Sequence, residues 1–159
     1  MVQVLITTGK KPGIACRAIA RAIFLAAPGS RLEFRGKRPL GSLIKKARLA
    51  HFTRVCTIYQ EEGKPSQLAF LSLEGQAPEW LSPKIKIASA SFAEKMPRRG
   101  QSSSVKITGA KARTLQKLFC PPKPPEGTGA GSSISAGTNS ISFSLGRQKL
   151  ATLGVFYAK

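Results

Sequence analysis

The chain has 159 residues, and 26 lysines and arginines against 7 acidic residues give it a net charge of +19. All seven acidic residues are glutamate, His51 is the single histidine, and the three cysteines (Cys16, Cys56 and Cys120) are far apart. This inventory excludes aspartic dyads and Asp-based calcium or magnesium sites, and it argues against a zinc site. We therefore expect no metal, no nucleotide cofactor and no small-molecule substrate.

The remaining composition indicates a globular protein of one domain, long enough to bury its own core. An odd number of scattered cysteines favours a reducing compartment over a disulfide framework. The N-terminus lacks the basic segment and apolar core of a secretory signal, and the longest apolar stretch, residues 19–27, is interrupted by Arg21. The expectation is a soluble, cytoplasmic protein with no membrane partner.

The first half of the chain predicts the order β-α-β-α-β-β. Pro12 suits the first turn of a helix that runs to Ala26, because proline lacks the N–H that would go unused there. A second helix follows Pro39, where Leu40, Leu43, Ile44 and Ala47 have the spacing i, i+3, i+4 and i+7. Strands are predicted over residues 2–7, 31–34, 54–60 and 66–73.

The second half again predicts strands and one helix. A connector over residues 74–83 contains two prolines and Trp80, which we expect to fill the core. The stretch 120–138 is rich in Pro, Gly and Ser, so it predicts a mobile loop rather than a phosphate-binding loop. The predicted elements lie over residues 84–90 (strand), 105–108 (strand), 109–119 (helix), 140–145 (strand) and 149–157 (strand).

Positive charge is spread along the whole chain, which indicates a basic folded surface rather than a basic tail. Residues 1–80 hold 13 basic and 5 acidic residues, and residues 81–159 hold 13 and 2. Such a surface is typical of proteins that bind a polyanion, most commonly nucleic acid. The residues predicted to contact phosphates are Lys10, Lys11, Arg17, Arg21, Arg35, Lys37 and Arg38.

Two local features support this choice of residues. Arg17 and Arg21 are four residues apart in the predicted first helix and therefore share a face. Gly36 lies within the basic loop of residues 35–38 and would let its backbone approach a phosphate closely. His51, and the adjacent Glu61 and Glu62 in a predicted turn, are interpreted as structural or solvated residues and not as catalytic groups.

Several short segments, in their order and spacing, resemble the Brix-domain family. Leu5-Ile6-Thr7-Thr8 followed by Lys10-Lys11-Pro12 is similar to the family's opening ITTSRxPS motif, and Arg17 and Arg21 match basic positions of its first helix. Further similar segments are Arg35-Gly36-Lys37 with Leu40, Leu43 and Ala47, then Gly63-Lys64-Pro65 before Leu68-Ala69-Phe70, Leu118-Phe119-Cys120-Pro121-Pro122, and Ile141-Ser142-Phe143.

The resemblance implies an α/β fold with two similar lobes of mixed β-sheet and helices, each like the anticodon-binding domain of class IIa aminoacyl-tRNA synthetases. Residues 1–159 would form a single Brix domain, with halves at 1–75 and 84–159 and without the family's C-terminal segment. It further implies a non-enzymatic, archaeal-type ribosome-biogenesis factor. Its expected partners are ribosomal RNA or its precursor and other ribosome-assembly proteins.

Three other function classes remain open at this point. An integral ribosomal protein has the same composition and differs by its stoichiometric presence in mature subunits. An RNA-processing enzyme would carry Glu and Lys residues at its site and would cleave or ligate precursor RNA. A peripheral membrane protein is the least supported, since the predicted basic faces lack exposed aromatic partners.

Overall fold

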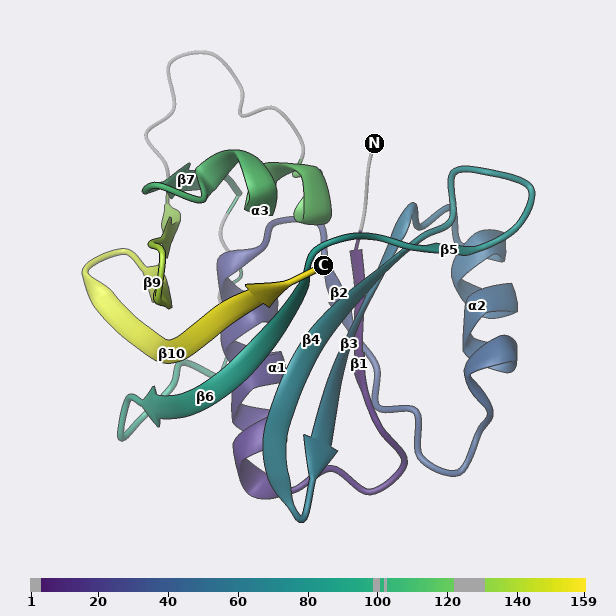
Figure 1. The fold of residues 1–159 in the computed structure, drawn as a ribbon, viewed down its shortest axis with the longest axis horizontal. Helices are drawn as coiled ribbons and strands as arrows, with labels where there is room; N and C mark the ends of the chain where they lie inside the picture. Colours follow the sequence, from purple (N-terminus) through teal and green to yellow (C-terminus); the bar gives the residue numbers. More distant parts are fainter. Residues whose placement is uncertain (1–3, 99–100, 102, 122–130) are drawn as a thin grey trace.

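A computed structural model describes residues 4–98, 101, 103–121 and 131–159. Three helices and ten strands are found in this part of the chain (Figure 1). In chain order they are β1 (Val4–Thr8), α1 (Ile14–Ala26), β2 (Arg31–Leu32), α2 (Leu40–Leu49), β3 (Arg54–Glu61), β4 (Lys64–Ser72), β5 (Glu79–Trp80), β6 (Lys84–Phe92), β7 (Val105–Thr108), α3 (Ala112–Phe119), β8 (Ser132–Ala136), β9 (Ser140–Leu145) and β10 (Gln148–Ala158).

The strands join into one mixed sheet in the order β2-β1-β3-β4-β6-β10-β9-β8-β7, with β5 paired to β4. β1 runs parallel to both β2 and β3, and β7 runs parallel to β8, while the other pairs are antiparallel. The two halves of the chain meet where β4 pairs with β6 through Gln67↔Lys86 and Leu68↔Ile85. The predicted mixed α/β class is thus confirmed, and a single sheet spans both halves.

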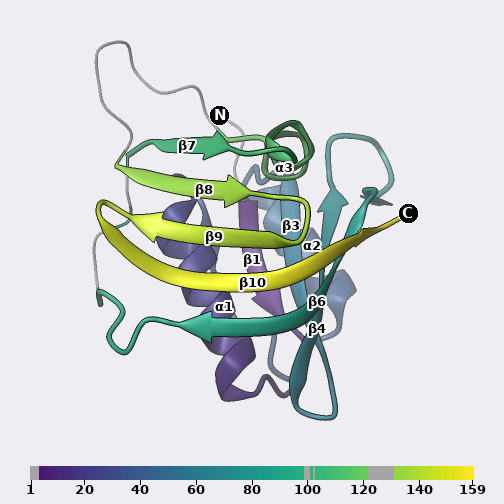
Figure 2. The ribbon, with the colours of Figure 1, turned by 60° about the vertical axis from the view of Figure 1, so that its left-hand side comes forward.

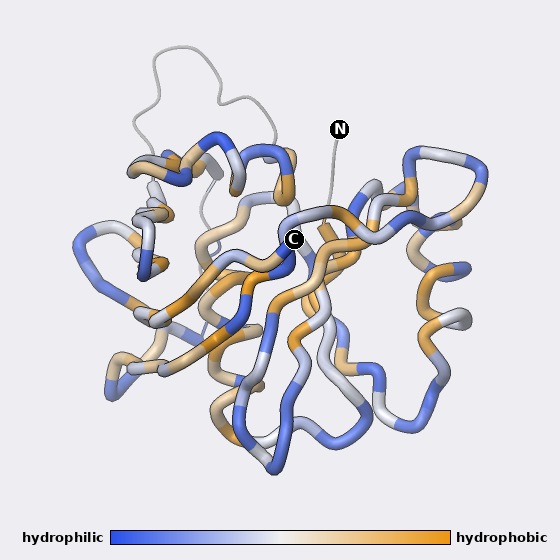
Figure 3. The backbone as a smooth tube through the Cα atoms, viewed as in Figure 1, coloured by the Kyte–Doolittle hydropathy of each residue, from blue (hydrophilic) through white to orange (hydrophobic). Residues whose placement is uncertain are grey.

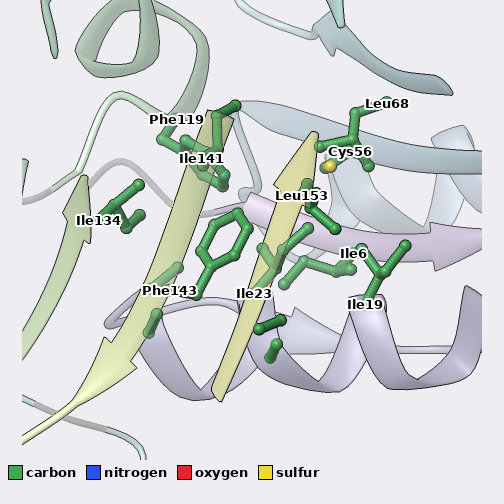
Figure 4. Packing of buried hydrophobic residues seen from close by; sticks show 14 of the residues in the cluster. Ile6, Ile19, Ile23, Cys56, Leu68, Phe119, Ile134, Ile141, Phe143 and Leu153 are labelled. Carbon is green, nitrogen blue, oxygen red and sulfur yellow. The ribbon is translucent and has the colours of Figure 1, made fainter. Parts of the chain in front are cut away.

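Helix α1 is the central element of the core because it contacts strands from both halves of the sheet. It packs against β1 to β4 on one side and β8 to β10 on the other, and Figure 2 shows it behind β6, β8, β9 and β10. Ile19 and Ile23 of α1 meet Ile6, Phe143 and Leu153 in this core (Figure 4). Each such side chain contributes roughly 1.5–3 kcal/mol of burial free energy.

A second, smaller core lies on the opposite face of β1, β3 and β4. There Leu43 and Ala47 of α2 are buried with Leu5, Val55 and Leu71. Successive residues of β1 therefore point to opposite faces, with Val4 and Ile6 toward α1 and Leu5 toward α2, as the period of a strand requires. This two-sided burial explains why residues 4–8 form an uninterrupted apolar and threonine run.

Most predicted elements are confirmed within one to three residues, but two expectations are wrong. Residues 132–136, assigned to the mobile loop, form β8 between β7 and β9, with Ile134 and Ala136 buried. Serines flank Ile134 and Ala136, so the alternation of buried and outward-facing residues is not evident in the sequence. The buried Ser132 hydroxyl donates a hydrogen bond to the Ala26 carbonyl at the end of α1 (2.8 Å). Residues 122–130 of the predicted loop lie outside the described residues.

Trp80 is the other wrong expectation, because its side chain is 43% exposed and does not fill the core. It lies on the short strand β5, which was not predicted and which pairs Leu71 with Trp80. The similarity of each half to an anticodon-binding domain remains a prediction. The structure does contain two strand–helix–strand units with parallel strands, β1–α1–β2 and β7–α3–β8.

The three cysteines differ sharply in how accessible they are. Cys16 and Cys56 are completely buried, whereas Cys120 at the end of α3 is half-buried. Burial raises the pKa of the Cys16 and Cys56 thiols, so little reactive thiolate forms there. We expect one thiol, that of Cys120, to react with a thiol reagent in the native protein, and all three after denaturation. A Cys120→Ser variant should abolish the native signal; its survival would contradict this placement.

Candidate nucleic-acid interface

Two loops rich in basic residues and the first turn of α1 meet at one end of the sheet. Because β1, β2 and β3 are parallel, their carboxyl ends lie at the same end of the sheet, next to the starts of α1 and α2. We call this region the basic end and define it by Lys10, Lys11, Arg17, Arg35, Lys37 and Arg38. In Figure 3 hydrophilic colouring gathers over the same loops and the β3–β4 turn.

The loop that carries Lys10 and Lys11 is fixed by Gln60 at the end of β3. The Gln60 Oε1 atom accepts a hydrogen bond from the Gly13 N–H (2.9 Å), and its Nε2 donates one to the Lys11 carbonyl (2.6 Å). Gly13 also approaches the β3–β4 turn so closely that a Cβ atom would lie 3.0 Å from the Gly63 carbonyl oxygen. The backbone is held in this way while both lysine side chains are exposed to solvent.

Arg17 lies next to the loop after β2, although the two are far apart in sequence. Its guanidinium carbon stands 6.0 Å from the centre of the Phe34 ring, a cation–π contact, and the Arg17 side chain is exposed. Phe34 is itself 43% exposed, so the expectation that the basic faces lack exposed aromatic partners is wrong. The first helix and the basic loop therefore form one continuous surface, which the sequence spacing did not establish.

Gly36 adopts a left-handed backbone conformation (φ +62°), which favours glycine and turns the loop sharply. The turn leaves Lys37 exposed at the tip. Arg35, on the other side of Gly36, is half-buried. Its Nε atom is buried and has no hydrogen-bond partner among the described residues. Because this Nε atom is buried, the loop reaches an anionic ligand through the exposed Lys37 at its tip.

Arg38 is engaged within the protein. It donates hydrogen bonds to the carbonyls of Phe34 and Arg35, and its guanidinium lies 3.1 Å from the Glu33 carboxylate, which also contacts the Lys46 ammonium at 2.6 Å. The hydrogen bond from Lys46 and, after it, the contact with Arg38 lower the pKa of Glu33 against the opposing effect of burial. This triad anchors the basic loop to α2.

We expect Glu33→Gln to reduce the free energy of unfolding by about 0.5–1 kcal/mol at pH 7, because both partly exposed ion pairs are lost. The pKa of Glu33 is lower in the folded than in the unfolded chain, so its contribution is complete above the ordinary value of 4.5. It disappears as the pH falls through the lowered folded-state pKa. Urea unfolding of both proteins at several pH values measures this, and a difference that grows toward acid pH would contradict it.

Arg21 faces a different part of the molecule. Its side chain is half-buried, and Nη2 donates a hydrogen bond to the Pro97 carbonyl (2.7 Å), which ties α1 to the segment after β6. The structure therefore brings together Lys10, Lys11, Arg17, Arg35, Lys37 and Arg38, with Arg21 beyond them along α1. That any of the seven contacts RNA stays a prediction.

Several residues at or near this end were not singled out from the sequence. Gln60 orders the first loop, and Phe34 of the second loop contacts Arg17 of α1. Neither residue type signals such a role from sequence alone. Tyr59, beside Gln60, is half-buried. Burial raises the pKa of the Tyr59 hydroxyl, and the nearby Arg35 guanidinium and Thr57 side chain oppose part of that increase.

The described residues hold no group of three or more His, Cys, Asp or Glu side chains that could bind a metal ion. Glu61 and Glu62 are exposed in the β3–β4 turn, in agreement with the interpretation of these residues as solvated. His51 is also exposed, at the end of α2 with φ +64°. No helix in the described part of the chain is long and apolar enough to cross a membrane.

Comparison with known proteins shows that other solved structures share this fold. No protein-family model and no curated protein matches the sequence. Among solved structures, the chain is similar to a probable ribosomal biogenesis protein from Aeropyrum pernix K1, with a TM-score of 0.74 and 18% identity over 100% of this chain and 97% of that one. It is also similar to Mil, an archaeal Imp4-like protein, with a TM-score of 0.67 and 20% identity over 96% of each chain. Both neighbours fit the expected resemblance, and at these identities they establish a shared fold.

Proposed function

We propose that this protein is a Brix-domain, archaeal-type ribosome-biogenesis factor that binds ribosomal RNA or its precursor and assists processing and subunit assembly without catalysing a reaction itself. The observation that carries the proposal is the convergence of Lys10, Lys11, Arg17, Arg35 and Lys37, from three separate segments, on one end of the sheet. The fold, shared over nearly the whole chain with two archaeal proteins of which one is named for ribosome biogenesis, supports it.

Phosphate contacts explain what this arrangement does. Exposed lysines and arginines neutralise backbone phosphates and release counterions, and these contacts position RNA without reading its sequence. Loops held by Gln60 and by the Glu33 triad present the charges at fixed positions. The protein would therefore recognise the shape of folded RNA and hold it during assembly, and other ribosome-assembly proteins would be further partners.

The test combines crosslinking in cells with a salt titration. Sequenced crosslinked fragments are expected to come from ribosomal RNA or its precursor, and the protein is expected in precursor particles. Its stoichiometric presence in mature subunits would instead indicate an integral ribosomal protein, and RNA cleavage or ligation by the pure protein would indicate an enzyme. With about five to eight phosphate contacts, the logarithm of affinity for folded ribosomal RNA should fall with the logarithm of salt concentration with a slope of about −4 to −7. A slope near zero would refute the proposal.

A further inference from the structure

An open groove of about 1130 Å³ runs beside the basic end, along the sheet face that points away from α1. It begins at Tyr59 and the β3–β4 turn, crosses β4 and β6, and ends at Phe156 on β10. Figure 1 shows β4, β6 and β10 in front of α1. The six residues of the basic end do not line this groove, so it is a separate feature of the surface.

Four groove residues form one row across four adjacent strands. The strand registers pair Tyr59 with Gln67, Gln67 with Lys86, and Lys86 with Phe156. Residues directly opposite each other in a sheet project from the same face. We call this set the cross-strand row: Tyr59, Gln67, Lys86 and Phe156.

The core does not account for the two aromatic rings of the row. The neighbours of the row residues along each strand, Ile58, Leu68, Ile85 and Val155, are buried against α1, so the row itself faces outward. The Phe156 side chain is 56% exposed, and Tyr59 is half-buried. A phenylalanine exposed within a regular strand loses burial free energy that an interior position would gain.

The row is polar and basic between its rings. The Lys86 Nζ atom donates a hydrogen bond to Gln67 Oε1 (2.5 Å), which holds the ammonium group over the middle of the row. The carboxylates that line the groove, Glu61 and Glu62, are confined to the turn at one rim.

We propose that the cross-strand row binds unpaired RNA nucleotides: Phe156 and Tyr59 stack on bases, and Lys86 contacts the intervening phosphates. The proposal deepens the proposed function, on which it rests, by naming single-stranded segments as the RNA that this part of the surface takes. Aromatic side chains stack on bases only where these are unpaired, because the bases of a helix are already stacked. The basic end, in contrast, would contact phosphates of helical and unpaired RNA alike.

The spacing of the rings agrees with more than one nucleotide. Three strand-to-strand steps of about 4.8 Å separate Tyr59 from Phe156, or about 14 Å in all. This is several times the rise of about 3.4 Å per nucleotide in a stacked strand, so each ring meets a different base. Lys86, which lies between them in strand order, is then placed against the connecting phosphates.

The test measures how Phe156→Thr affects binding of an unpaired RNA of about ten nucleotides and of a duplex of the same length. Threonine keeps the strand preference of this exposed position. Loss of one stacked base should weaken binding of the unpaired RNA about 5- to 150-fold. The salt slope should not change, because stacking releases no counterions, and duplex binding should change by less than about twofold.

Two further variants make the result specific. Trp80→Thr removes an aromatic ring that is 43% exposed and does not line the groove, and it should leave binding of the unpaired RNA unchanged. Phe156→Trp, made in a Trp80→Phe background, keeps a stacking ring and should retain affinity. Its single tryptophan should also lose fluorescence when the unpaired RNA binds.

Three outcomes would overturn the inference: no binding of the unpaired RNA by the wild type, an unchanged affinity in Phe156→Thr, or equal losses for both RNAs. An unchanged affinity would point to a protein segment as the occupant of the groove. A failure of the proposed function would give a different pattern. Folded ribosomal RNA would then bind without salt dependence, while Phe156→Thr would still weaken binding of the unpaired RNA.

Discussion

Phe143→Ala is expected to reduce the free energy of unfolding by about 3–5 kcal/mol, a large part of the stability of a domain of this size. Phe143 is completely buried on β9 and points into the core beside Ile23 of α1 (Figure 4). Truncation removes the buried area of the ring and leaves a cavity that neighbouring strands cannot easily close. Urea unfolding followed by circular dichroism measures the loss.

The same measurement tests whether α1 unites the two halves of the chain. Since α1 packs on strands of both halves, unfolding should remain a single transition in the wild type and the variant. Ser144→Ala, the next position along β9, serves as the control and should change stability by less than about 1 kcal/mol. A Phe143→Ala loss below about 1 kcal/mol would contradict the role of this ring in the core. Two separated transitions would show that the halves unfold independently.

A combined variant, Lys10→Ala, Lys11→Ala, Arg17→Ala and Lys37→Ala, is expected to flatten the salt slope for folded ribosomal RNA by about three to four units. All four side chains are exposed, so their removal should not unfold the protein, and each phosphate contact contributes about 0.9 units. The ratio of wild-type to variant affinity should therefore be about 100-fold smaller at roughly 200 mM salt than at roughly 50 mM salt. Titrations at four or more salt concentrations measure both slopes.

The matched control removes four exposed basic residues from the second half of the chain: Lys95, Lys106, Lys117 and Arg147. Both variants have the same net charge, so a general effect of charge would lower their slopes equally. We expect the control to lose less than about one unit. If the control loses the larger share, the RNA contact surface lies in the second half of the chain and not at the basic end.

The sequence by itself determined the elements whose pattern is local. The spacing of Leu40, Leu43, Ile44 and Ala47 predicted α2, whose Leu43 and Ala47 are buried. The alternation around the β3–β4 turn and at Gly146-Arg147 predicted two hairpins, which are confirmed. Periodicity reports burial on one face of an element, and that signal is complete within the element itself.

The long-range partners of those elements were decided only by the tertiary structure. Ser132–Ala136 forms a strand because β7 and β9 flank it. Trp80 is exposed because it lies on β5, a two-residue strand that pairs only with β4, outside the main strand order of the sheet. Neither outcome is encoded within a few residues of the segment, since strand pairing depends on neighbours that are distant in the chain. Composition and local spacing therefore led to wrong predictions for the strand at residues 132–136 and for the burial of Trp80.

The candidate site likewise has features that the sequence predicts and features that only the tertiary structure reveals. The charge of Lys10, Lys11 and the 35–38 loop could be read from the sequence, and so could the shared face of Arg17 and Arg21. That Arg17 meets Phe34, that Arg21 binds the Pro97 carbonyl, and that Tyr59 and Phe156 share a row with Lys86 could not. These juxtapositions depend on strand register, because a shift of one residue would turn each row side chain to the opposite face of the sheet.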